Sequence, residues 1–378
     1  MRPPAKMDWV LLFALLPILS AGLVTMYSFT DENSFFIKQL IWIAVSLIFF
    51  FGASFIDWRF LRRSNVLFGL FLGSAVLLLF LFVAGQTVKG AQSWFDFGVF
   101  SFQPVEPIKL ILILILAKYF SRRHIEIANL RHLFVSGAYA FILFTLVLLQ
   151  PDFGGALVVF LIWFSLVLVS GISKRHLLAV CLIGALSVAG LWVFVFKDYQ
   201  KARLISFVHP LADIRGTGYN ANQSMIAVGS GGLLGKGVGL GSQSRLKFLP
   251  EYETDFIFAA FAEEWGFIGV LTLCLSFGVV LFRILSAALA GRSNFESLYA
   301  LGLVGFIMGQ ILIHAGMNVG LLPVTGITLP FMSYGGTNLV TLFLGLGILM
   351  GMRRYERDVH RELIQNEASV GALPSSVV

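Results

Sequence analysis

A cluster of carboxylates lies at the beginning of one apolar segment of the chain. The stretch FLPEYETDFIFAAFAEEWGFIG, from Phe248 to Gly269, holds five of the 20 acidic residues. They are Glu251, Glu253, Asp255, Glu263 and Glu264. A carboxylate at the partly dehydrated mouth of a helix can remain ionised and accept a proton, which is what a general base for a sugar hydroxyl must do. This stretch is therefore the first candidate for a catalytic site.

Asp255 is the member of the cluster best placed for chemistry. It lies directly before the apolar run FIFAAFA, where a long polar segment enters a hydrophobic one. At about 100° per residue, Glu263 returns to within about 80° of Asp255, whereas Glu264 points to the opposite face. At most one of the two glutamates is therefore expected to share a site with Asp255. The alternative for Asp255 is a helix N-cap without a chemical role.

Two further polar motifs interrupt apolar stretches. QPVEPIKL places Glu106 and Lys109 three residues apart, on one helix face, where they can form an ion pair. That pair either neutralises both charges and nothing more, or it directs Lys109 towards an anionic headgroup or diphosphate. Asp152, in QPDFGGAL, is predicted to cap the helix that follows it, because its side chain can accept from the unpaired amides of the first turn.

Several other motifs do not support a cofactor site. The run GSGGLLGKGVGLG resembles a phosphate-binding loop, but Ser230 and Gly237 occupy positions where Gly and Ser or Thr are required. The six histidines show no metal-ligand spacing, and His209 and His314 are isolated in the sequence. Two cysteines within apolar runs cannot build a disulfide framework or a thiolate site. No cofactor is predicted from these residues.

The elements that carry these residues are predicted to be membrane-spanning helices. Hydrophobic residues make up 58% of the 378 and charged residues 12%, and the mean hydropathy is +0.87. Soluble domains carry about a quarter charged residues. Apolar runs of roughly 17 to 25 residues, long enough to cross a bilayer as helix, occur at ten places. They are residues 8–28, 35–56, 64–84, 104–120, 133–150, 153–171, 176–196, 256–289, 296–321 and 330–352.

Lys and Arg predict the orientation, because basic residues in short loops stay on the cytoplasmic side. They gather in alternate connections and near both ends of the chain, so both termini are predicted to be cytoplasmic. The fold class is an all-α polytopic membrane protein of ten transmembrane helices, with a large extracytoplasmic loop, about residues 197–255, between helices 7 and 8. The net charge of +7 follows from this asymmetry, and no nucleic-acid partner is expected.

The chain is predicted to form one transmembrane domain, residues 1–352, followed by a polar cytoplasmic tail, 353–378, that is expected to be disordered. Two outer connections are unusual besides the long loop. Residues 85–110 carry Trp94 and several Phe, which suits an amphipathic piece at the membrane interface. Residues 320–339 are rich in Pro and Gly and predict a partly unwound re-entrant segment, which is tolerated only where it is buried or lines a wet cavity. The three segments together predict one cavity.

These motifs resemble those of the SEDS family (shape, elongation, division and sporulation), the polytopic peptidoglycan glycosyltransferases. The resemblance covers nearly the whole chain, and the segments GLGSQSRLKFLPEYETDF and GLLPVTG are more similar to RodA-type elongation proteins than to the FtsW-type division branch. The other motifs that carry it are QPVEPIKL, QPDFGGAL, GTGYNANQSMIAVGSGGLLGKG, AEEWGFIG and GLLPVTGITLPFMSYGGTNL.

The resemblance implies an enzyme that polymerises the lipid-linked precursor lipid II on the outer face of the cytoplasmic (inner) membrane during cell elongation and shape maintenance. Asp255 falls on the family's aspartate and would be the general base toward the 4-hydroxyl of the acceptor sugar, which displaces undecaprenyl diphosphate. The implied partners are a class B penicillin-binding protein and other proteins of the elongation complex. The positions implied to contact diphosphate or glycan are Glu106, Lys109, Arg203, Gln223, Ser224 and Glu251.

Three departures and several alternatives accompany the resemblance: QPVE stands for the family's QPSE, Lys247 stands where an acid is common, and the third is Glu253. Glu253 lies where the family often has His, and a carboxylate so close to Asp255 leaves open a divalent cation such as Mg or Mn. Alternatives to an elongation polymerase are a transporter (flippase) for a lipid-linked cell-wall precursor, an FtsW-like division paralogue with the same chemistry, and a scaffold without catalysis. A transporter commonly shows paired broken helices in two inverted halves, whereas only residues 323–335 read as broken.

Overall fold

Each apolar segment predicted from the sequence coincides with a helix. A computed structural model of the chain describes residues 7–28, 34–88, 91–98, 100–121, 130–194, 201, 205, 207, 218–246, 248–291 and 293–370. The helices at the ten predicted segments are α1 (Trp9–Ser28), α2 (Ser34–Phe55), α3 (Ser64–Ala84), α4 (Val105–Ser121), α5 (Leu130–Leu149), α6 (Phe153–Val169), α7 (Lys174–Phe194), α11 (Ile257–Leu289), α12 (Asn294–Asn318) and α13 (Gly336–Val370).

Most of these helices are long and apolar enough to cross a membrane. Within the described ranges, seven helices meet that criterion by length and composition, and α6 is a shorter apolar helix. The seven are α1, α2, α3, α5, α11, α12 and α13. The protein is therefore a multi-pass, mostly helical membrane protein. Many large apolar side chains point outward on these helices, for example Ile48, Phe68 and Phe282, as expected where the surrounding medium is lipid.

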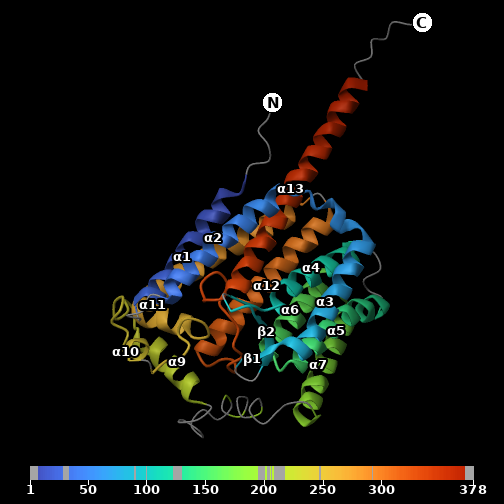
Figure 1. The fold of residues 1–378 in the computed structure, drawn as a ribbon. Helices are drawn as coiled ribbons and strands as arrows, with labels where there is room; N and C mark the ends of the chain where they lie inside the picture. The colour runs from blue at the N-terminus through green and yellow to red at the C-terminus, as the bar shows by residue number, and fades with distance from the viewer. Residues whose placement is uncertain are drawn as a thin grey trace, which may run out of the picture.

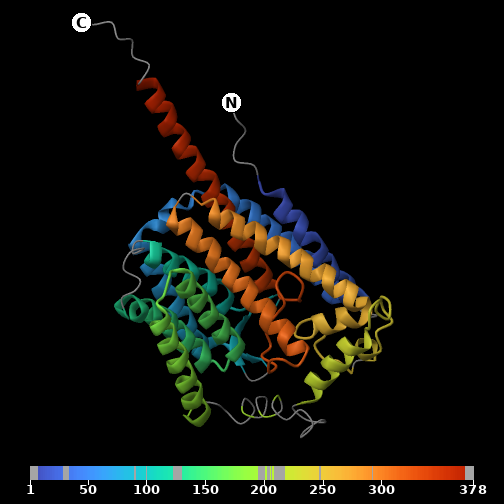
Figure 2. The same ribbon diagram turned by 180° about the vertical axis from the view of Figure 1, so that it is seen from behind.

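The helices form a bundle whose two ends differ. The first turns of α1 and the last turns of α13 lie towards the same end (Figures 1 and 2). The opposite end carries the short helices α9 (Tyr219–Ser230) and α10 (Ser242–Arg245) and a small sheet. The segment 197–255 therefore contains helices of its own in its described part. α13 continues beyond the bundle to Val370 as a helix, and the disorder expected of the tail stays a prediction. Residues 353–370 contain neither Gly nor Pro to interrupt a helix.

The connection between α3 and α4 is a small sheet, and its place at the membrane interface stays a prediction. It consists of β1 (Gln86–Val88), β2 (Ala91–Asp96) and β3 (Ser101–Phe102), antiparallel and in the order β1-β2-β3. The aromatic and β-branched residues that suggested an interfacial segment also favour pleated strands. The Gln92 N–H donates to the Gln150 carbonyl at 3.2 Å, which joins the sheet to the α5–α6 connection.

The segment between α12 and α13 is unwound, as predicted. Residues 319–335 contain no helix, and Gly320, Gly326 and Phe331 have positive φ angles of 75°, 72° and 63°. Glycine adopts such angles without strain, whereas Phe331 does not. Phe331 and Met332 are almost fully buried, so this irregular backbone lies inside the protein. Burial is the condition under which a membrane protein tolerates unwound backbone at membrane depth.

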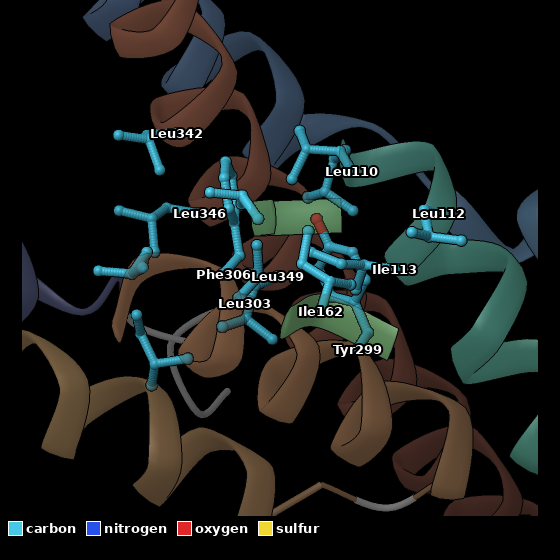
Figure 3. Packing of buried hydrophobic residues seen from close by; sticks show 14 of the residues in the cluster. Leu110, Leu112, Ile113, Ile162, Tyr299, Leu303, Phe306, Leu342, Leu346 and Leu349 are labelled. Atoms are coloured by element: carbon cyan, nitrogen blue, oxygen red, sulfur yellow. The ribbon is translucent and has the colours of Figure 1, made fainter. Parts of the chain in front are cut away.

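An apolar core joins α4, α6, α12 and α13 (Figure 3). Leu110 and Ile113 of α4 pack there with Leu303 and Phe306 of α12. Tyr299 is fully buried in this core, and its hydroxyl donates to the Gly345 carbonyl at 3.0 Å. The core holds the three helices α4, α12 and α13 in fixed relation, and these helices carry several of the polar residues described below.

α11 is interrupted at Gly266, where φ is 64° and ψ is −164°. In a continuous helix, the N–H groups of Phe267 and Ile268 would donate to the carbonyls of Glu263 and Glu264. The break separates these four groups, and each needs another partner because it is buried or lies at membrane depth.

The glycine-rich loop, residues 231–241, supplies the four partners. Four main-chain hydrogen bonds of 2.9–3.2 Å join the loop to the break: Lys236 and Gly237 donate to the carbonyls of Glu263 and Glu264, and the carbonyls of Gly232 and Leu233 accept from Phe267 and Ile268. A Cβ at Gly235 would collide with the Glu264 carbonyl, and its φ is +81°. The glycines that resembled a phosphate-binding loop therefore serve close backbone packing.

Candidate active site

The three unusual connections meet around one cavity of about 620 Å³, as the sequence predicted. Its walls come from the sheet and the first turn of α4, from the α5–α6 connection, from the residues before α11, and from the unwound segment 319–335. The charged residues among those that line it are Lys38, Asp96, Glu106, Lys109, Asp152 and Asp255. Asp255 thus shares a cavity with Glu106, Lys109 and Asp152, which lie far from it in the sequence.

Asp255 lies just outside α11. The N-cap residue of α11 is Phe256, which makes no side-chain cap hydrogen bond, so Asp255 is not the helix cap that the alternative interpretation proposed. Asp255 is partly buried and lines the cavity. Gly326 lies beside the carboxylate, since a Cβ built on this glycine would be 3.7 Å from Asp255 Oδ2. The unwound segment thus passes directly by the candidate base.

The main chain around Asp255 is fixed by three consecutive carbonyl contacts. The Tyr334 N–H donates to the Glu253 carbonyl at 2.8 Å, and the Ser333 hydroxyl donates to the Thr254 carbonyl at 2.8 Å. The Asn318 side-chain amide donates to the Asp255 carbonyl at 3.0 Å. We call these contacts the carbonyl clamp. Because the donors come from the end of α12 and the unwound segment, the clamp fixes Asp255 relative to the cavity wall.

Glu106 and Lys109 form the predicted ion pair. Lys109 Nζ lies 2.6 Å from Glu106 Oε1, and both residues are buried although they line the cavity. The Asn338 amide donates to Glu106 Oε2 at 3.1 Å and to the Thr328 hydroxyl at 2.9 Å. The positive charge of Lys109 is thus matched by a carboxylate of the protein. The pair fits both alternatives, because it neutralises the two charges and also holds Lys109 on the cavity wall.

Asp152 caps α6, as predicted. Its Oδ1 accepts from the Gly155 N–H at 2.7 Å, and its Oδ2 accepts from the Gln103 side chain at 3.3 Å. Burial raises the pKa of Asp152, although the hydrogen bond from Gly155 and the charge of Lys109 act in the opposite direction. The carboxyl therefore combines a structural role with a place on the cavity wall.

Those of the remaining predicted substrate residues that the structure describes do not line the cavity. Ser224 is fully buried, and its hydroxyl donates to the Asn318 carbonyl at 2.9 Å and to Asn318 Oδ1 at 3.2 Å. It joins α9 to α12, and its contact with substrate stays a prediction. Gln223 and Glu251 are not among the described residues that line the cavity. Arg203 lies outside the described residues.

Neither Glu263 nor Glu264 lines the cavity, because α11 begins only at Ile257 and the helical angle cannot be counted from Asp255. Glu263 is fully buried and accepts hydrogen bonds from the glycine-rich loop and α10. Its donors are Lys236 Nζ at 2.7 Å, the Gln243 N–H at 3.0 Å, the Ser242 hydroxyl at 3.2 Å, and the N–H and hydroxyl of Ser244, each at 3.3 Å. Glu264 accepts from the Gly239 N–H at 2.6 Å.

Sequence reasoning missed a polar row on α12. Gln310, His314 and Asn318 are four residues apart, so they lie on one face of an apolar helix, and all three are fully buried. His314 is therefore not isolated. Polar residues inside a spanning helix are costly, and this spacing was the available signal. Within the residues that the structure describes, no group of three or more His, Cys, Asp or Glu side chains could hold a metal ion.

The chain was compared with known proteins. Residues 5–358 match the model of the FTSW_RODA_SPOVE cell cycle protein family. Stage V sporulation protein E of Bacillus subtilis is 37% identical over 363 residues, covering 93% of this chain and 98% of the relative. Peptidoglycan glycosyltransferase MrdB of Escherichia coli is 36% identical over 288 residues, covering 76% of this chain and 78% of the relative.

Solved structures show the same fold. A chain from a peptidoglycan synthase complex, described as coordinating polymerization and crosslinking, superimposes with a TM-score of 0.79 at 32% identity, covering 92% of this chain and 97% of that one. Rod shape determining protein RodA of Thermus thermophilus superimposes with a TM-score of 0.69 at 31% identity, covering 92% and 97%. With a family match over most of its length and this shared fold, the chain belongs to the FtsW/RodA/SpoVE family of SEDS proteins.

Proposed function

We propose that this chain polymerises lipid II into glycan strands on the outer face of the cytoplasmic membrane, during cell elongation and shape maintenance. It is an enzyme of the peptidoglycan glycosyltransferase class, since its relatives in Escherichia coli and several other bacteria are named peptidoglycan glycosyltransferases. The observation that supports this reading best is the position of Asp255, which lines the cavity with its main chain fixed by the carbonyl clamp.

Asp255 acts as the general base in the proposed reaction. Its carboxylate takes the proton of the 4-hydroxyl of the acceptor sugar, and the hydroxyl oxygen attacks the anomeric carbon of the donor sugar. The bond from that carbon to the diphosphate oxygen breaks, and undecaprenyl diphosphate leaves with the electron pair. A base on a fixed backbone holds its oxygen close to the hydroxyl without reorganisation at the moment of reaction.

The topology of the proposal follows the arrangement of the bundle. Ten spans with both termini in the cytoplasm place the cavity, the sheet and the helices α9 and α10 on the outer side, where lipid II is polymerised. The first turns of α1 and the last turns of α13 lie towards one end and these features towards the other, which supports this orientation (Figure 1). A class B penicillin-binding protein is the proposed partner, and the likeness to a chain of a peptidoglycan synthase complex supports it.

Purified full-length protein, reconstituted with its cognate transpeptidase, should convert labelled lipid II into polymer. Asp255→Ala and Asp255→Asn should both abolish polymer while the amount of folded protein is unchanged. Asp57→Asn is the matched control, because Asp57 precedes the short 3₁₀ helix Trp58–Arg62, outside the cavity lining, and pairs with Arg59. Polymer at a near-normal rate from Asp255→Asn would exclude the proposed base.

The assignment to elongation, as opposed to division, is the more specific part of this proposal, because relatives from both branches are similar to the chain. Motif similarity to RodA-type proteins supports elongation over division. Depletion of the protein from its own cells should make rods round. Filaments with unfinished septa would instead assign it to division and leave the proposed chemistry intact.

A further inference from the structure

The polar row on α12 consists of Gln310, His314 and Asn318, which lie one helical turn apart. All three side chains are fully buried. Burying a polar group is unfavourable unless it makes hydrogen bonds, so each member of the row needs a partner. His314 and Asn318 bond to main-chain carbonyls, whereas Gln310 has no partner among the described residues.

Two members of the row hold the main chain of the cavity wall. His314 Nδ1 is 2.7 Å from the Ile327 carbonyl, and because a carbonyl only accepts, Nδ1 carries the proton. The Asn318 amide donates to the Asp255 carbonyl at 3.0 Å. Ile327 and Asp255 both line the cavity. His314 and Asn318 therefore shape the cavity without facing it.

Gln310 differs, because it lines the cavity itself. Its exposed fraction is 0%, and neither Nε2 nor Oε1 has a hydrogen-bond partner in the described part of the chain. A leucine at this position would fill a similar volume without leaving a buried donor and acceptor unpaired. An unpaired amide on the wall of the cavity that Asp255 also lines is the arrangement expected of a group that binds a ligand.

The surroundings of Gln310 favour an uncharged ligand group. Phe306 lies one turn before Gln310 on α12, and Lys109 Nζ is 5.5 Å from the centre of its ring. The charge of Lys109 is matched by Glu106 at 2.6 Å, so this part of the cavity offers no net positive charge for a phosphate. A primary amide presents an acceptor and N–H donors side by side, and the group that complements both is another amide.

We propose that Gln310 is a substrate-recognition residue that pairs with the acetamido group of an N-acetylhexosamine bound in the cavity. The inference rests on the proposed function, which supplies an N-acetylated disaccharide as the substrate. The carboxamide of Gln310 donates to the acetamido carbonyl and accepts from its N–H, and no bond is made or broken there. The amide is covered in the ligand-free protein, so binding includes a shift of neighbouring side chains, which is common on complex formation.

The test measures binding separately from turnover. Labelled lipid II and an analogue with a hydroxyl in place of the acetamido group on the terminal hexosamine are bound to full-length protein carrying Asp255→Ala, with and without Gln310→Leu. Gln310→Leu should bind lipid II about tenfold more weakly, the loss of one well-paired amide. Both proteins should bind the analogue alike. Thermal stability of Gln310→Leu should equal or exceed that of its parent, because an unpaired buried amide is removed.

Thr25→Val is the matched control, since Thr25 is also fully buried and its hydroxyl has no hydrogen-bond partner among the described residues, but Thr25 is not one of the residues that line the cavity. It should leave lipid II binding unchanged. Equal affinity of Gln310→Leu and its parent for lipid II would overturn the proposal. It would mean that an internal water, and not the substrate, is the hydrogen-bond partner of the Gln310 amide. The proposal would also be overturned if Gln310→Leu bound the analogue more weakly than lipid II by the same factor as its parent does. Failure of the proposed function is distinguishable, because it appears as polymer formed by Asp255→Ala.

Discussion

The side-chain amide of Asn318 donates a hydrogen bond of 3.0 Å to the main-chain carbonyl of Asp255. Asn318 Oδ1 also accepts from the Ala259 N–H at 3.2 Å, in the first turn of α11. One buried side chain at the end of α12 therefore holds both the candidate base and the start of the helix that follows it. The position of Asp255 thus depends on a residue 63 positions away in the sequence.

Asn318→Ala should impair both folding and catalysis. It leaves the Asp255 carbonyl and the Ala259 N–H without this partner, which is expected to lower the free energy of unfolding by about 2–4 kcal/mol. A shift of Asp255 by about 1 Å is expected to reduce kcat by roughly 10²-fold. Thermal unfolding of the purified protein and polymerisation of labelled lipid II measure the two effects.

The control for Asn318 is Ser224→Ala, which removes only the hydroxyl that donates to Asn318. This variant is expected to lose about 1 kcal/mol of stability and to keep its kcat, because Asn318 still reaches Asp255. If Asn318→Ala kept the wild-type kcat, the carbonyl clamp would have no part in positioning the base.

Glu263→Gln should loosen the glycine-rich loop without touching the cavity. The buried carboxylate accepts from Lys236 at 2.7 Å and from four donors of α10, and a neutral amide cannot accept from all of them. The free energy of unfolding is expected to fall by about 2–4 kcal/mol, because hydrogen bonds to a buried charge are among the stronger ones. Hydrogen exchange over residues 231–246 should increase, whereas exchange in α4 should not.

Lys236→Met is the matched variant for Glu263→Gln. The Lys236 side chain is 29% exposed, so solvent screens its charge, and the main-chain and hydroxyl donors to Glu263 remain. Its effect on exchange in the loop should be clearly smaller than that of Glu263→Gln. Equal effects of the two variants would mean that the ion pair alone, and not the set of donors, holds the loop.

Substitutions at Gly232 and Gly235 of the loop distinguish the effect of backbone strain from that of a steric collision. Both have positive φ, +57° at Gly232 and +81° at Gly235, but a Cβ at Gly232 meets nothing within 4 Å, whereas one at Gly235 collides with the Glu264 carbonyl. Gly232→Ala should therefore lower the free energy of unfolding by about 1 kcal/mol, from backbone strain alone. Gly235→Ala should lower the free energy of unfolding several times as much, because the loop can no longer pack into the break in α11. Similar melting temperatures for the two variants would contradict this packing.

Asp152 should make stability depend on pH. Burial raises its pKa above the ordinary value of 3.8, so between these two values the folded protein holds the proton that the unfolded chain has lost. The contribution of Asp152 to stability is therefore complete below about pH 3.8 and is lost as the pH rises through the raised value. Asp152→Asn keeps an N-cap oxygen but cannot titrate. The difference in melting temperature between wild type and this variant should change across that window, and a constant difference would contradict the raised pKa.

Local rules acting on the sequence determined much of this protein. Length and hydropathy located each long helix, because a bilayer sets how many apolar residues a span needs. Spacing alone predicted the Glu106–Lys109 pair and the Asp152 cap, since both depend on residues within one helical turn. Pro and Gly predicted the unwound segment before α13. The resemblance to SEDS proteins then selected Asp255 from five nearby acids.

Only the tertiary structure decided which polar residues meet. Ser224 and Gln310 are both polar residues within helices, yet one joins α9 to α12 and the other lines the cavity. Glu263 and Glu264 belong to the loop that fills the break at Gly266, which no helical angle counted from Asp255 could show. These outcomes depend on contacts between segments far apart in the sequence. Local periodicity specifies a helix face but not the segment that packs against it, and that choice is made by the packing of the whole bundle.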